Sequence, residues 1–199
     1  MVMSASSFSG FPADARILGL DIGSISVDVV LLDGLGTPLY SRYVRHHGQP
    51  DKVLCAELEA LERTHAGIAA AVTGTGADRV GRLLGACAVN EVIAQVAAAS
   101  FRCPQARSVI DIGGQDSKVI LLDPSGGQVK DFLMNDKCAA GTGRFLEMTM
   151  SRVGSDIASI DTFVEGAEPV TINSMCAVFA ESEIIGLLAQ ETPPGSIAL

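Results

Sequence analysis

The chain has 199 residues, enough for one large domain or two small ones. It is rich in hydrophobic residues (48%) and in glycine (21) but poor in aromatic residues (5%), a composition that predicts a globular α/β protein. A formal net charge of −9 argues against nucleic acid as the main partner, and five cysteines without a short CxxC spacing argue against a zinc ribbon or a secreted disulfide framework. No apolar run is long enough to span a membrane, so we expect a cytoplasmic protein.

The first half of the chain is expected to form one α/β lobe. Residues 1–15 are rich in Ser and Gly without a signal-peptide pattern, and we expect a flexible tail there. Short apolar runs between glycine-bearing turns predict strands, the first three as an antiparallel meander, and apolar residues at helical spacing predict helices. The predicted elements are strands at residues 17–22, 26–32, 38–44 and 68–72 and helices at 51–65 and 91–99, in a lobe that spans 16–104.

The pattern then starts again at residue 108. Residues 108–116 repeat the apolar strand and Asp-x-Gly turn of residues 18–24. An internal duplication of this kind predicts two similar lobes that face a cleft, the second spanning 105–199. The predicted elements are a strand within 108–112, strands at 117–122, 129–133 and 170–173, a helix from the glycine loop at 141–143 to Val153, and a helix at 178–189. The second lobe has fewer elements than the first, so we expect it to be incomplete at its C-terminus.

The two repeated turns are candidates for phosphate binding. Asp21-Ile22-Gly23-Ser24 and Asp111-Ile112-Gly113-Gly114-Gln115 have glycines that let phosphate approach the main-chain N–H groups, and aspartates that can hold the water shell of Mg²⁺. One such turn alone is ordinary turn chemistry. A third glycine loop, Gly141-Thr142-Gly143, opens a helix whose first N–H groups would be free for an anion. Together they indicate a split nucleotide site. The turn at 73–76 fits phosphate binding and simple strand termination equally well.

Cys138 and Cys176 are candidate ligands of an iron–sulfur cluster. Each stands at the expected start of a helix, and at Cys138 the positive helix end favours the thiolate form. Two thiolates are half of what such a cluster needs, so a second subunit across a two-fold axis would supply the rest. The competing interpretation of Cys138 is a small buried side chain, and we expect Cys55, Cys87 and Cys103 to be packing residues.

Four segments together resemble the activators of 2-hydroxyacyl-CoA dehydratases, a family that also holds the ATPase subunits of benzoyl-CoA reductase. The resemblance runs from about Ile17 to the end of the chain, and the long motif around Cys138 is its most specific part. The Asp-x-Gly turns are shared with the whole actin, hexokinase and chaperone class of ATPases. The segments are Asp21–Ser24, Val109–Asp116, Met134–Phe145 and Cys176–Glu183.

The resemblance implies an α/β, actin-like (ribonuclease H-like) fold and ATP hydrolysis coupled to electron transfer. It implies a homodimer that shares one [4Fe-4S] cluster through Cys138 and Cys176 of each subunit, and that binds ATP or ADP with Mg²⁺. An electron from ferredoxin or flavodoxin would reach a partner dehydratase or reductase that acts on a CoA thioester. The implied catalytic residues are Asp21, Asp111 and Gln115, and the implied nucleotide-binding residues are Gly23, Ser24, Gly113, Gly114, Gly141, Thr142 and Gly143.

The sequence departs from the family pattern in the first turn. Ile25 and Asp28 stand where the family usually has a threonine and a lysine that faces the phosphates, so we expect weaker nucleotide binding or a changed Mg²⁺ dependence. The family's C-terminal part, with the glycines that hold adenosine, has no counterpart here. Two other functions stay open: a sugar or acid kinase of the same fold, for which Asp156 and Asp161 are the available bases, and a non-catalytic nucleotide-binding subunit.

Overall fold

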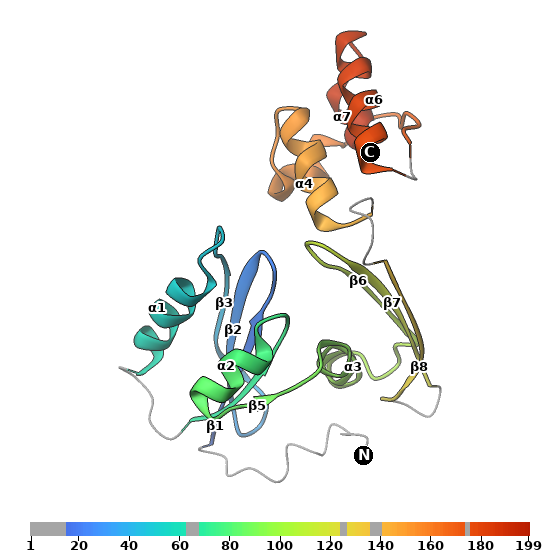
Figure 1. Ribbon diagram of the computed structural model, residues 1–199. Helices are drawn as coiled ribbons and strands as arrows, with labels where there is room; N and C mark the ends of the chain where they lie inside the picture. The colour runs from blue at the N-terminus through green and yellow to red at the C-terminus, as the bar shows by residue number, and fades with distance from the viewer. Residues whose placement is uncertain (1–14, 63–67, 124–126, 136–140, 174–175) are drawn as a thin grey trace. The chain divides into compact units, whose positions relative to one another are not determined.

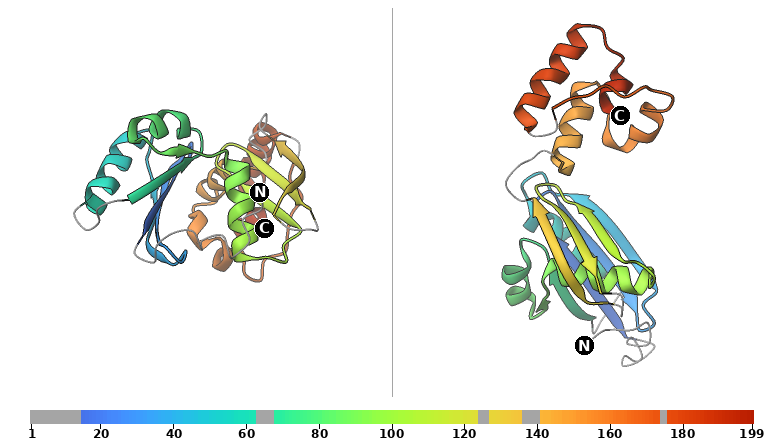
Figure 2. Two further views of the ribbon diagram at one scale, coloured as in Figure 1. Left: turned by 90° about the horizontal axis from the view of Figure 1, so that it is seen from below. Right: turned by 90° about the vertical axis from the view of Figure 1, so that its right-hand side faces the viewer.

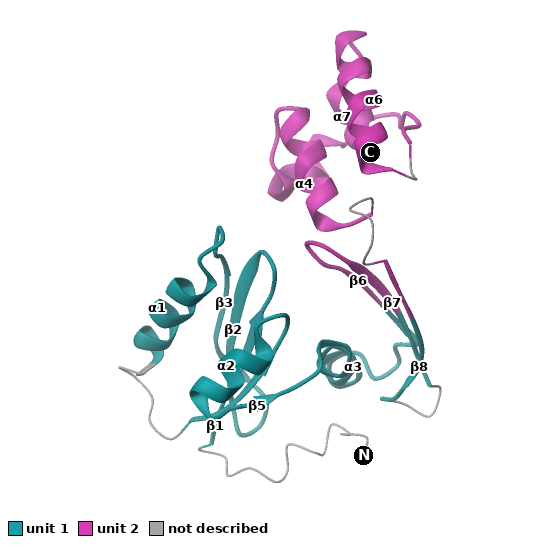
Figure 3. Ribbon diagram, viewed as in Figure 1, with its two compact units in different colours: residues 1–109, 120–132 teal, residues 110–119, 133–199 magenta. Residues whose placement is uncertain are grey.

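The computed structural model describes residues 15–62, 68–123, 127–135, 141–173 and 176–199 (Figure 1). The chain divides into two compact units, residues 1–109 with 120–132 and residues 110–119 with 133–199 (Figure 3). Each unit has hydrophobic clusters of its own. Within the described ranges, no helix combines the length and the apolar character needed to cross a membrane.

Unit 1 is built on a five-stranded sheet with the order β3-β2-β1-β4-β5. The first three strands form the expected antiparallel meander, and β4 lies parallel to β1. In this register Asp21 lies opposite both Asp28 and Thr73, so the three polar residues share one face at one end of the sheet. The strands are β1 (Arg16–Ile22), β2 (Ser26–Asp33), β3 (Pro38–Arg45), β4 (Ile68–Thr73) and β5 (Cys87–Ala88).

Helices α1 (Pro50–Glu62) and α2 (Ala77–Leu84) cover the other face of this sheet (Figure 2, left). Alternate residues of β1 and β2 point into the core because successive side chains of a strand lie on opposite faces. The core that they form with the two helices contains Leu18, Leu20, Ile22, Val27, Val29, Leu31, Leu54, Leu61, Val72, Ala77 and Val80. The same alternation leaves Asp21 and Asp28 on the face that these helices do not cover.

A three-stranded sheet, ordered β6-β7-β8, repeats the strand meander, and the boundary between the units runs through it. Helix α3 (Glu91–Arg102), capped by the Asn90 side chain, packs Val96 against this sheet. The buried sheet residues in this cluster are Ile120 and Leu122. The strands are β6 (Ser108–Ile112), β7 (Ser117–Leu122) and β8 (Val129–Asn135), and their exposed apolar residues include Ile110, Ile112, Val119 and Leu121.

The rest of unit 2 is helical. Its core joins Met150 and Val153 to Ile184 and Ile197. The Arg152 guanidinium forms an ion pair with Glu181 between two of its helices. The elements are α4 (Gly143–Arg152), the short 3₁₀ helix η2 (Ile157–Ser159), α5 (Ile160–Phe163), α6 (Ala177–Ala189) and α7 (Pro194–Ala198).

The order of elements confirms the two β-β-β-α repeats, β1-β2-β3-α1 and β6-β7-β8-α4. The strand predicted at 170–173 is wrong: the Val170 N–H donates to Ser196 O and the Asn173 N–H donates to the Glu183 carboxylate, so these donors are not used in a sheet. The predicted elements omitted α2, β5, η2, α5 and α7, all short. The predicted tail lies outside the described residues except for Ala15, and so does the end of the helix predicted at 51–65.

Candidate functional site

The first predicted phosphate turn lies between β1 and β2 in unit 1. The Gly23 N–H donates to Ser26 O at 3.0 Å, which closes a tight turn over Ser24 and Ile25. A Cβ on Gly23 would lie 3.4 Å from Ser26 O, within van der Waals contact of the turn. Asp21, the last residue but one of β1, is half-buried. The structure therefore brings Asp21, Gly23 and Ser24 together as the sequence predicts.

The loop after β4 packs directly against this turn. Gly74 has a φ of +84°, and a Cβ there would overlap the Asp21 carboxylate and lie 2.7 Å from Ile22 O. The Gly76 N–H donates to Ile22 O at 3.1 Å. The close approach of this loop to β1 therefore explains why residues 74 and 76 are glycines. A phosphate-binding role for the loop stays a prediction.

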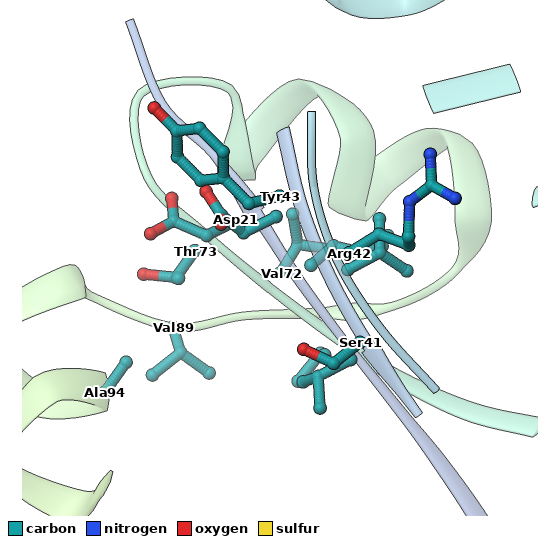
Figure 4. Close-up of a pocket in the computed structure, with 14 residues that line it drawn as sticks. Asp21, Ser41, Arg42, Tyr43, Val72, Thr73, Val89 and Ala94 are labelled. Atoms are coloured by element: carbon teal, nitrogen blue, oxygen red, sulfur yellow. The ribbon is translucent and has the colours of Figure 1, made fainter. Parts of the chain in front are cut away.

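A cavity of about 310 Å³ opens on the face of the five-stranded sheet that carries Asp21 and Asp28 (Figure 4). Asp21, Thr73 and Tyr43 lie side by side at one end of it (Figure 4). The Thr73 hydroxyl oxygen is buried and has no hydrogen-bond partner within the part of the chain that the structure describes. Because a buried hydroxyl without a partner is unfavourable, this end of the cavity is suited to a polar ligand.

Asp28 is a second carboxylate that lines this cavity, opposite Asp21 in the register. The Ser26 hydroxyl donates to Asp28 Oδ2 at 3.0 Å. Burial raises the pKa of Asp28 above its ordinary value, and the hydrogen bond from Ser26 opposes that rise. Two neighbouring carboxylates repel phosphate, so this end of the sheet can accept an anion only with a cation between them.

The second predicted phosphate turn, in unit 2, is built around a lysine that the sequence analysis missed. Lys118 Nζ donates to Asp111 Oδ2 at 3.3 Å and to Asp116 Oδ1 at 2.8 Å. The lysine side chain is 3% exposed, whereas those of Asp111 and Asp116 are 28% and 32% exposed. In β7, buried and exposed positions alternate, and Lys118 shares the buried face with Ile120 and Leu122. That alternation was the available signal, because a lysine on a core face needs a buried acidic partner.

The glycines of this second turn hold the start of α4. The Gly143 N–H donates to Gly113 O at 2.8 Å, and the Arg144 N–H donates to Gly114 O at 3.2 Å. The Ser117 hydroxyl donates to Gly141 O at 2.5 Å. The expectation of free N–H groups at this helix start is therefore wrong for Gly143 and Arg144. Turn and helix form one hydrogen-bonded segment instead.

Two further predicted residues belong to this segment. Gln115 is exposed, at the position that follows Gly114 in the turn. Thr142 is fully buried at the N-cap of α4, and its carbonyl accepts the N–H groups of Phe145 and Leu146. Asp111, Gly113, Gly114, Gly141 and Gly143 complete the set of predicted residues that the structure brings together in unit 2.

Cys176 stands at the N-cap of α6 as a half-buried free thiol. Its N–H donates to Asn173 Oδ1 at 3.0 Å, and the nearby side chains of Val178 and Phe179 are 68% and 62% exposed. Cys138 lies outside the described residues. Among those that are described, no group of three His, Cys, Asp or Glu side chains could hold a metal ion.

The prediction that the remaining cysteines are packing residues is wrong. Cys55, Cys87 and Cys103 are all exposed free thiols. Cys55 lies on α1, but the buried residues that this helix contributes to the core are Leu54 and Leu61. Cys87 is in the two-residue strand β5, and Cys103 follows the last residue of α3.

Comparisons with known proteins agree on one family. The model of the BadF/BadG/BcrA/BcrD ATPase family matches residues 18–198. The activator of lactoyl-CoA dehydratase of Anaerotignum propionicum is 39% identical over 180 residues, which cover 86% of this chain and 67% of that protein.

Two solved structures resemble the chain over most of its length. The (R)-2-hydroxyglutaryl-CoA dehydratase component A of Acidaminococcus fermentans has a TM-score of 0.81 at 31% identity and covers 93% of this chain and 72% of its own. The activator of the 2-hydroxyisocaproyl-CoA dehydratase of Clostridium difficile, with bound ADPNP, has a TM-score of 0.79 at 33% identity, with coverages of 92% and 69%.

Proposed function

The chain belongs to the BadF/BadG/BcrA/BcrD ATPase family and has an actin-like ATPase fold, and from this premise we propose that it is an ATP-hydrolysing iron–sulfur activator. It would drive a low-potential electron into a partner dehydratase or reductase that acts on a CoA thioester. Relatives named as activators of lactoyl-CoA and 2-hydroxyisocaproyl-CoA dehydratases support this proposal. Ferredoxin or flavodoxin would supply the electron.

The observation that carries the proposal is the hydrogen-bonded segment in unit 2. Gly113 and Gly114 belong to a predicted phosphate turn, and their carbonyls accept the first N–H groups of α4. The chain that leads into α4 carries Cys138, three residues before Gly141. A small displacement of the turn by a phosphate therefore moves the helix start and the chain next to a cluster ligand.

The geometry of the turns supports the nucleotide-binding roles that we propose. The Ser24 N–H, which follows Gly23 in the first turn, and a main-chain N–H near Gly114 would bind phosphate oxygens. Asp21 and Asp111 would hold the water shell of Mg²⁺. Lys118 would keep Asp111 in place. The exposed Gln115 would orient the water that attacks the terminal phosphate.

Cys138 and Cys176 of two subunits would hold the cluster, which supplies one-electron chemistry when it is bound. Cys176 fits this role because its thiol is free and stands at a helix start. The exposed Val178 and Phe179 beside it fit a surface that a second subunit covers.

The test is the iron and acid-labile sulfide content of the anaerobically purified protein. We expect about four irons per dimer, lost in Cys138→Ser and in Cys176→Ser. Cys55→Ser, which changes an exposed thiol on α1, serves as the matched control and should keep its iron. Folded protein that takes up no iron after reconstitution would contradict the cluster. ATP turnover, measured on the same samples, tests the ATPase part separately.

The second candidate, a non-catalytic nucleotide-binding subunit, is favoured by one observation. Asp28 places a carboxylate on the cavity face where the resemblance leads us to expect a lysine. Measurable binding of nucleotide without hydrolysis would support it. The kinase alternative has less support, because the Asp156 carboxylate accepts the Ala158 N–H at the start of η2 and is committed to that cap.

A further inference from the structure

We propose that His46 is a positioning residue for phosphate: in its neutral form, with the proton on Nε2, it orients the peptide between Gly23 and Ser24 in the first phosphate turn. This inference rests on the proposed nucleotide site. It adds a residue that lies outside the motifs identified in the sequence and that contacts the turn from just beyond the C-terminal end of β3.

His46 is buried, 7% exposed, just beyond the last β2–β3 pair, Ser26 with Arg45. Its N–H donates to Ile25 O at 3.0 Å, and its Nε2 lies 3.3 Å from Gly23 O. Main chain and side chain therefore contact the first phosphate turn at two points. An imidazole buried among main-chain polar groups is held there by both of these contacts.

The hydrogen bonds of the ring determine where its proton lies. The Gly48 N–H donates to His46 Nδ1 at 3.0 Å, so Nδ1 must carry a lone pair. The ring proton then lies on Nε2, which donates to Gly23 O. The Gln49 N–H donates to His46 O at 2.8 Å, which fixes the main chain of the same corner. Each polar atom of His46 thus has one hydrogen-bond partner, and its role as donor or acceptor is determined.

The contact to Gly23 O acts on the phosphate donor through the planarity of the peptide. Gly23 C=O and Ser24 N–H belong to one trans peptide and point in opposite directions. A hydrogen bond that fixes the carbonyl therefore fixes the direction of the Ser24 N–H. Glycine at position 23 leaves this peptide free to rotate without His46, because glycine populates a wide range of backbone angles.

The first experiment measures the ring proton in the free protein. A long-range ¹H–¹⁵N spectrum of the full chain should show the Nε2-protonated neutral form of His46, and the Nδ1-protonated form would overturn the proposal. This measurement needs no nucleotide, so its outcome is independent of the proposed function.

The second experiment compares two variants in ATP–Mg²⁺ binding by calorimetry. His46→Leu keeps the bulk and removes both ring contacts, whereas His46→Gln keeps one donor and one acceptor. We expect His46→Leu to bind about fivefold more weakly, the factor that one neutral hydrogen bond corresponds to, and His46→Gln to recover most of the affinity. The exposed neighbour supplies the control, His47→Asn, which should bind like the parent chain; asparagine tolerates the positive φ of 46° found there.

A positioning role also predicts which kinetic constant moves. Where ATP turnover is measurable, His46→Leu should raise KM and leave kcat nearly unchanged, because the Ser24 N–H binds substrate and transition state alike. Equal affinity in His46→Gln and His46→Leu would overturn the proposal, since packing alone would then explain the residue. A parent chain that binds no nucleotide would instead refute the proposed function, while the position of the ring proton would still test His46.

Discussion

Replacing Lys118 by methionine tests how the second phosphate turn is held. The change keeps the length of the side chain and removes the ammonium that donates to Asp111 and Asp116. The lysine side chain is 3% exposed, so its ammonium is buried beside both acids. The two carboxylates would then repel each other without the ammonium that lies within hydrogen-bond distance of both.

The size of the effect follows from the two contacts. A hydrogen bond to a charged group contributes about 1.5–3 kcal/mol, and breaking a fully buried ion pair costs about 3–5 kcal/mol. Asp111 and Asp116 are 28% and 32% exposed and can be hydrated in part, which reduces the penalty. We therefore expect Lys118→Met to lower the free energy of unfolding by about 3 kcal/mol.

Urea unfolding at neutral pH measures this difference, with Lys130→Met on the neighbouring strand β8 as the control. Lys130 is exposed, and its replacement should change stability by less than about 0.5 kcal/mol. Adding Asp116→Asn to Lys118→Met should restore part of the loss, because one unpaired charge is removed. A Lys118→Met chain as stable as the Lys130→Met control would refute the reasoning.

Three further changes have defined outcomes. Burial raises the pKa of Asp28, so its ionisation lowers the stability of the folded chain as pH rises, and Asp28→Asn should be more stable than the parent at pH 7. The difference should vanish below pH 3.8, where the carboxyl is protonated in the folded and the unfolded chain. A difference that persists there would contradict this explanation. Gly74→Ala should lose more than about 1 kcal/mol in thermal unfolding, from its left-handed φ and the overlap with Asp21. Asn173→Ala removes the acceptor of the Cys176 N–H, so it should cost about 1 kcal/mol of stability and speed alkylation of Cys176; unchanged alkylation would show that this hydrogen bond does not hold the thiol in place.

The turns and strands of both repeats could be predicted from the sequence because local rules determine them. Alternating apolar residues in β1 and β2 and the glycines between them specify a hairpin without reference to the rest of the chain. Asp21, Gly23 and Ser24 followed from that hairpin. The helix α2 was missed because it is short and begins in a glycine-rich turn, where sequence signals favour a loop.

The contacts between distant segments could not be predicted. His46 reaches Gly23 across 23 positions of sequence, and Gly74 meets Asp21 only because β4 pairs with β1. Whether the first N–H groups of α4 are free depends on which acceptors from other segments lie beside them. The carbonyls of Gly113 and Gly114 accept two of these N–H groups. Periodicity describes one element at a time and contains no information on such neighbours.

The locality of the second phosphate turn has a consequence for folding kinetics. Asp111, Asp116 and Lys118 come from one short stretch of chain, and each lysine contact spans at most seven positions. Closing such short loops costs little chain entropy, so contacts of this kind form early. The first turn needs β4 and the corner at His46 and must wait for longer loops to close. We therefore expect the turn around Lys118 to be structured in the folding transition state, and the turn around Gly23 to become ordered after it.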